Sequence, residues 1–149
     1  TTKLDMNLQK SIGRAFETVT VITDTDIKRN QSIFQPIPAA SILNFQHRVN
    51  SLYMPALPCE GDTEKYMQVL QVKDDSIYKY SDFLGAGLIV QNLQRNDFVG
   101  VTSGLPINSS SSLRLAVRFV QGVARAAVQY TSYMKVIKPY LYDKITISV

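Results

Sequence analysis

The feature of this sequence that most constrains its fold is a strict alternation of apolar and polar residues over positions 113–119. The segment reads Leu113, Arg114, Leu115, Ala116, Val117, Arg118 and Phe119. Side chains of a β-strand point alternately to its two faces, so this pattern predicts a half-buried strand with a cationic outer row. The apolar face of such a strand requires a second layer of structure to cover it.

Other segments favour short strands. Residues 16–23 are dense in β-branched side chains, which lose little freedom on a pleated surface. Residues 66–72 alternate in the manner of a half-buried strand, and residues 97–102 form a short apolar run. We therefore expect strands over these three segments and a loop over 103–108, where serine, glycine, proline and asparagine gather.

Proline and glycine shape the middle of the chain. Residues 34–58 hold four of the six prolines, each of which removes a backbone donor, so we do not expect a long regular helix there. Residues 39–53 fit either a strand or a short helix, and we favour the strand. In the apolar run 84–90, Gly85 and Gly87 indicate a bulge or a close approach of another backbone.

After Gly122 the apolar period changes from two to about 3.6. The positions that follow this period are Ala126, Tyr130, Tyr133, Met134 and Ile137. The spacing predicts an amphipathic helix that ends near Pro139 and packs its two tyrosines against the sheet. Residues 144–149 alternate again and are interpreted as a short strand or an arm.

Short strands, frequent turn residues and the absence of a βαβ rhythm predict a mainly β protein. We expect one antiparallel β-sandwich domain over residues 1–149 with one C-terminal helix. No apolar run approaches the roughly 20 residues of a membrane-spanning helix, so no membrane insertion is expected. The chain begins without methionine, which suggests a piece of a longer polypeptide.

The residues that usually carry catalysis are scarce. The sequence has one histidine, His47, and one cysteine, Cys59, and it has no spacing for a zinc site, no nucleophile elbow and no phosphate-binding loop. We predict no catalytic residues, no metal and no cofactor. The acid pairs Asp24/Asp26 and Asp74/Asp75 are interpreted as turn residues, with calcium shared between subunits as the alternative.

Charge is distributed unevenly. Residues 95–149 hold seven basic side chains against two aspartates, while the first 94 residues are close to balanced. A basic C-terminal third favours a polyanionic neighbour, because lysine and arginine bind phosphates through Coulomb attraction and counterion release. A solvated basic face without a ligand explains the same pattern, and both interpretations stay open.

Residues 98–149 carry a resemblance to a known family. A strand leads into Thr102-Ser103-Gly104-Leu105-Pro106, a serine-rich turn and the strand 113–120 follow, and a helical segment closes with Tyr140-Leu141-Tyr142-Asp143. This order resembles the end of jelly-roll coat proteins of the nodavirus type, a fold that bacilladnavirus capsid proteins also resemble.

The resemblance implies an antiparallel jelly-roll β-sandwich that serves as a structural subunit of an icosahedral virus capsid. Such a subunit assembles with copies of itself inside the host cell, encloses viral nucleic acid without reading its sequence, and resides in the virion. In that family the C-terminal segment lies beneath the shell near the genome. The resemblance therefore implies a nucleic-acid-binding surface formed by Arg114, Arg118, Arg125, Lys135 and Lys138.

Two other classes of function fit the same sequence. One is a β-sandwich binding module that recognises a carbohydrate or protein ligand through its loops, in which the basic face is incidental. The other is an enzyme with a small carboxylate-based hydrolase site, which the scarcity of catalytic residues disfavours.

Overall fold

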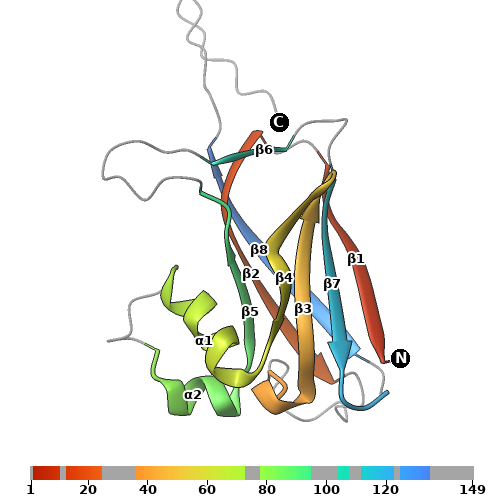
Figure 1. Ribbon diagram of the computed structural model, residues 1–149, viewed down its shortest axis with the longest axis vertical. Coiled ribbons are helices and arrows are strands. Elements are labelled where there is room, and N and C mark those ends of the chain that lie inside the picture. The colour runs from red at the N-terminus through yellow and green to blue at the C-terminus, as the bar shows by residue number, and fades with distance from the viewer. Residues whose placement is uncertain are drawn as a thin grey trace, which may run out of the picture.

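The structure is a computed structural model that describes residues 2–10, 13–24, 36–72, 78–94, 104–107, 112–122 and 125–134. Within these ranges, strands form two antiparallel sheets packed face to face (Figure 1). The predicted mainly β, antiparallel sandwich is therefore confirmed.

Sheet A contains four strands. Their order is β1 (Lys3–Lys10), β7 (Ser112–Phe119), β3 (Ile42–Val49) and β4 (Leu52–Glu60). The strand predicted from the alternation over 113–119 is β7, and it lies inside the sheet between β1 and β3. The strand favoured for 39–53 is β3, which follows the short 3-10 helix η1 (Ala39–Ser41).

Sheet B is built around β2 (Gly13–Asp24), which contains the predicted strand 16–23. Strand β8 (Arg125–Met134) pairs with β2 along residues 14–24. Because β8 occupies that whole edge, β5 (Leu88–Asn92) and β6 (Leu105–Ile107) pair with successive stretches of the opposite edge.

The core lies between the sheets. Phe45 and Leu115 of sheet A pack with Ile22 and Ile89 of sheet B, and all four are 0% exposed. Burying a side chain of this size contributes about 1.5–3 kcal/mol. This shared core fixes which face of each strand points outward.

Two helices cover the outer face of sheet B beside β5 (Figure 1). Helix α1 (Asp62–Leu70) buries Val69, and helix α2 (Tyr80–Gly85) buries Phe83. Both side chains pack in one cluster with Val90 of β5. No helix in the described ranges has the length and apolarity needed to cross a bilayer.

The predicted helix after Gly122 is wrong over the described residues, because 125–134 form β8. The backbone of this segment is held by pairing with β2 over ten residues, a long-range interaction that overrides the helical spacing. Tyr130 and Tyr133 do not pack against the sheet, and they are 61% and 52% exposed.

The strand predicted over 66–72 is also wrong, because residues 66–70 belong to α1 and residues 71 and 72 form a turn. Gly61 enters the helix at φ 67, and Asp62 and Glu64 lie in the first turn, where the helix dipole favours acids. The buried positions Lys65 and Val69 are four residues apart, which is helical spacing.

Three further segments have distinctive sequence patterns. The loop predicted over 103–108 contains the short strand β6. In the apolar run 84–90, residues 84 and 85 end α2, and Gly87 makes the predicted close approach, since an added Cβ would lie 2.8 Å from Cα of Ala39. The predicted strand 97–102 and the alternating segment 144–149 lie outside the described residues.

Candidate anion-binding face

Strand β7 places Arg114 and Arg118 on the outer face of sheet A. Their neighbours Leu115 and Val117 fill the core at 0% exposure, so the alternation of the strand forces the arginines toward solvent. The cationic outer row predicted for this strand is present.

The arginines of β7 lie directly opposite other cations. Arg114 is opposite Arg48 of β3, and Arg118 is opposite Lys3 of β1. Like charges in directly opposed positions destabilise a sheet, by up to about 1 kcal/mol per pair. We call Lys3, Arg48, Arg114 and Arg118 the cationic face.

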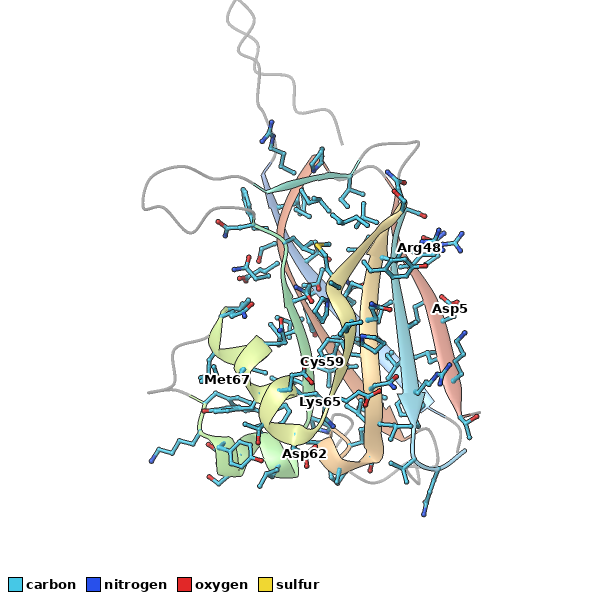
Figure 2. The ribbon with its side chains drawn as sticks, viewed as in Figure 1. Asp5, Arg48, Cys59, Asp62, Lys65 and Met67 are labelled. Atoms are coloured by element: carbon cyan, nitrogen blue, oxygen red, sulfur yellow. The ribbon has the colours of Figure 1, made fainter. Side chains whose placement is uncertain are left out.

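Few carboxylates in the described part of the protein lie near the cationic face. Among the residues that the structure describes, none of its four side chains forms an ion pair with a carboxylate. The two like-charged pairs are separated by the row Asp5, Ala116 and Gln46, so Asp5 is the carboxylate nearest to both in the register. Figure 2 shows Arg48 and Asp5 over the same side of sheet A.

Arg48 is held in place at one end of this face. Its Nε donates a hydrogen bond to the carbonyl oxygen of Asn50 at 2.5 Å, and its guanidinium lies 5.3 Å from the ring centroid of Tyr53. A cation over an aromatic face is stabilised by the ring quadrupole. The guanidinium is thus positioned beside an exposed ring that can stack on a planar ligand.

Two shallow hollows flank Arg48. One, of about 250 Å³, is bounded by Arg48, Asn50, Ser112 and Arg114. The other, of about 180 Å³, is bounded by Asp5, Gln46, Arg48, Tyr53, Arg114 and Ala116. Arg48 and Arg114 border both, so an anion in either hollow meets two guanidinium groups.

The remaining residues predicted to bind nucleic acid do not join this face. Arg125 begins β8 in sheet B, and its side chain lies outside the described residues. Lys135 and Lys138 lie outside them altogether. Lys3 and Arg48 were missed from the sequence, because only the pairing of distant strands brings them beside β7.

His47 is buried between the sheets rather than at the surface. Its Nε2 lies 3.2 Å from Oγ1 of Thr18 across the core, and its Nδ1 has no partner among the described residues. Desolvation by burial lowers the pKa of His47 to about 3, so the ring is neutral. A neutral ring at 0% exposure cannot reach a substrate.

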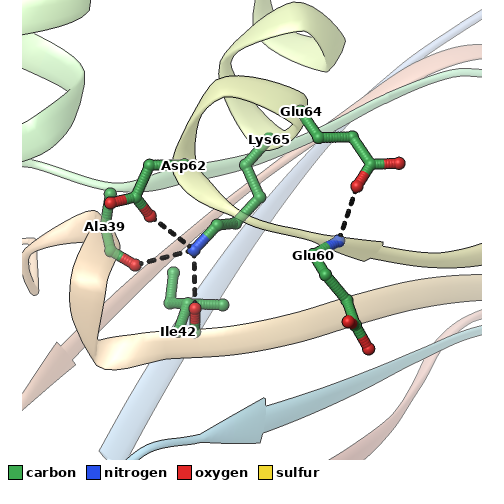
Figure 3. Close-up of polar contacts among 6 residues, drawn as sticks. All are labelled: Ala39, Ile42, Glu60, Asp62, Glu64 and Lys65. Carbon is green, nitrogen blue, oxygen red and sulfur yellow. Dashed lines mark hydrogen bonds and ion pairs between the residues drawn. The ribbon is translucent and has the colours of Figure 1, made fainter.

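Lys65 is a buried cation with a structural role (Figure 3). Its Nζ donates to the carbonyl oxygens of Ala39 at 3.0 Å and Ile42 at 2.6 Å, and it lies 2.8 Å from Oδ1 of Asp62. These contacts tie α1 to the beginning of β3. The side chain is satisfied where it lies and is only 3% exposed.

The described residues contain no group of three histidine, cysteine or acidic side chains that could hold a metal ion. Comparison of the chain with protein-family models, curated proteins and solved structures finds no match. The function of the chain is therefore inferred from its fold and its cationic face.

Proposed function

We propose that this protein is a structural subunit of an icosahedral virus capsid whose cationic face contacts the packaged nucleic acid. The observation that carries the proposal is the pair of directly opposed cations, Arg48 with Arg114 and Lys3 with Arg118. A sheet that keeps like charges opposite each other loses stability on its own and regains it when an anion lies between them. Phosphates bound in this way are recognised by charge and not by sequence.

The strand order supports a jelly roll. The eight strands of that fold, lettered B to I, form sheets ordered C-H-E-F and B-I-D-G. Sheet A matches C-H-E-F through β1, β7, β3 and β4, and sheet B matches I-D-G through β8, β2 and β5. In this assignment β6 is an addition between G and H, and no described strand takes the place of B.

Binding to single-stranded oligonucleotides of unrelated sequence tests the role of the face. Affinity should fall linearly with the logarithm of salt concentration, and the double variant Arg114→Gln/Arg118→Gln should reduce that slope by about 1–2. The matched control is Arg14→Gln/Lys79→Gln, which removes the same charge at exposed positions outside sheet A. Equal losses in the two double variants would reject the cationic face.

Electron microscopy and nuclease protection of the protein expressed at full length test assembly. The proposal expects closed particles that contain protected nucleic acid. Replacing Arg114 and Arg118 by glutamine, and separately Arg125, Lys135 and Lys138, should lower protected nucleic acid per particle more than it lowers particle yield. A protein that stays monomeric and binds a glycan would instead support the binding module.

A further inference from the structure

The two sheets differ in width on one side of the sandwich. The hydrogen-bond contact between Thr18 and His47 places β2 opposite β3. Strands β4 and β5 lie on the same side, because Cys59 and Ile89 share a core cluster. It follows that β8 faces β7, and that β1 has no strand of sheet B opposite it in the described part of the chain.

The inner face of β1 is accordingly incompletely covered. Leu4 and Met6 point inward and are only half-buried, whereas their cross-strand neighbours Val117 and Leu115 are 0% exposed. On β8, both polar side-chain atoms of Gln129 are shielded from solvent without a partner among the described residues. We call the inner face of β1 and the free edge of β8 the open margin.

Among the strands that the structure describes, β8 is an edge strand, and it lacks the features that normally block added strands. It is ten residues long, and residues 126–133 contain no charge, proline or glycine. The other edges are protected: β1 carries Lys3, Asp5 and a bulge, β4 carries Pro55 and Pro58, and β5 is short and flanked by α1. Added pairing is therefore expected at β8.

The geometry of the open margin limits what can enter it. Sheet A extends one strand beyond sheet B there, so a second copy cannot align its own β8 with this edge, because its sheet A would collide with β1. One extended strand fits: its backbone pairs with β8, and every second side chain covers Leu4 and Met6.

We propose that residues 144–149 of this chain fill the open margin as an additional strand antiparallel to β8. This segment alternates Ile145, Ile147 and Val149 with polar residues, as an added strand with one buried face requires. It follows β8 after a connection of nine residues, 135–143, which includes Pro139 and is ample for a return turn. The proposal does not depend on the capsid function.

The register of the added strand against β8 follows from which side chains of β8 point into the interior. Ala127, Gln129 and Thr131 point inward, opposite Ile22, Thr20 and Thr18 of β2. If Val149, Ile147 and Ile145 pair with those three residues in that order, the apolar side chains all enter the interior while Thr146 and Ser148 face solvent.

A designed disulfide tests the pairing directly. Gln129→Cys with Ile147→Cys should form an intramolecular disulfide on mild oxidation, since directly opposed Cα atoms of an antiparallel pair, about 4.5–5.5 Å apart, lie within the range of about 4.4–6.8 Å that disulfides span. Gln129→Cys with Thr146→Cys is the control, and it should cross-link at least ten times more slowly. Native Cys59 does not interfere, because it is 0% exposed and burial raises its pKa to about 12.

Hydrogen exchange of the full chain provides a second measurement that needs no cysteine. Ile145→Asp/Ile147→Asp should raise the exchange rate of the outward amides of β8 at least tenfold and leave β7 unchanged. Thr146→Asp/Ser148→Asp adds the same charge on the other face and should leave β8 protected.

Three results would overturn the proposal. The first is equal cross-linking in the two cysteine pairs, and the second is a disulfide that joins two copies. The third is a hydrogen-exchange rate in β8 that does not change in Ile145→Asp/Ile147→Asp. Loss of oligonucleotide binding or of particles would bear on the proposed function and not on this strand.

Discussion

At the scale of single residues, the buried polar groups determine how stability responds to conditions. His47 and Lys65 are both enclosed by the fold, but the first is neutral and the second is a charged group with three polar partners. Replacing His47 should therefore change how the unfolding free energy depends on pH, whereas replacing Lys65 should lower the unfolding free energy itself.

Acid should destabilise the protein through His47. The pKa of this group is about 3 in the folded protein, against an ordinary value of 6.5 that the unfolded chain retains. Between these values the unfolded chain binds a proton that the native state excludes. The contribution of His47 to stability is fully present above pH 6.5 and declines by about 1.4 kcal/mol per pH unit below it.

Denaturant unfolding of wild type and His47→Gln at pH 7.5 and pH 5 measures this contribution. The difference in unfolding free energy between the two proteins should change by about 2 kcal/mol between those pH values, in the direction that favours the variant in acid. Comparing the two proteins cancels the pH dependence that arises from the carboxylates they share. A difference that is constant with pH would contradict the neutral buried ring.

Lys65→Met should lower the unfolding free energy by about 2–4 kcal/mol. The variant keeps the length of the side chain but leaves two carbonyl oxygens and Asp62 without their cation. Lys79→Met is the control, since exposed substitutions change stability by about 0.5 kcal/mol or less. Equal unfolding midpoints for the two variants would show that the contacts of Lys65 are dispensable.

At the scale of elements, local pattern predicted strands where side chains alternate and each strand carries its own apolar face. Strands β2, β3 and β7 were predicted for this reason. Helix α1 and strand β8 were not, because long-range packing overrides the alternation of 66–72 and the helical spacing of 126–134. In α1 the deciding contacts involve Lys65 with η1 and β3, which no local pattern contains.

The packing of η1 against the connection between α2 and β5 should be sensitive to a single methyl group. Gly87→Ala places a Cβ 2.8 Å from Cα of Ala39 and should cost about 1–3 kcal/mol. Gly85→Ala meets no atom within 4 Å and should be neutral or slightly stabilising. Thermal unfolding of both variants checks this, and equal midpoints would be inconsistent with the close approach.

At the scale of the whole molecule, the sandwich was predictable and its site was only partly so. The alternation of 113–119 located Arg114 and Arg118 on an outer face without any knowledge of the fold. It could not identify Lys3 and Arg48, which are distant in sequence and become neighbours only through the pairing of β1 and β3 with β7. Charge composition pointed instead to the C-terminal third, whose Arg125 lies in the other sheet.

Under the proposed function, the opposed cations of sheet A would couple the stability of a subunit to the polyanion that it binds. A ligand that binds only the folded state raises the free energy of unfolding in proportion to the logarithm of its concentration. Subunits that have met a polyanion would therefore outlast empty ones under heat or proteolysis. If the proposed function holds, the electrostatic penalty between Arg48 and Arg114 would favour the survival of subunits with bound polyanion, and would enrich them before a shell closes.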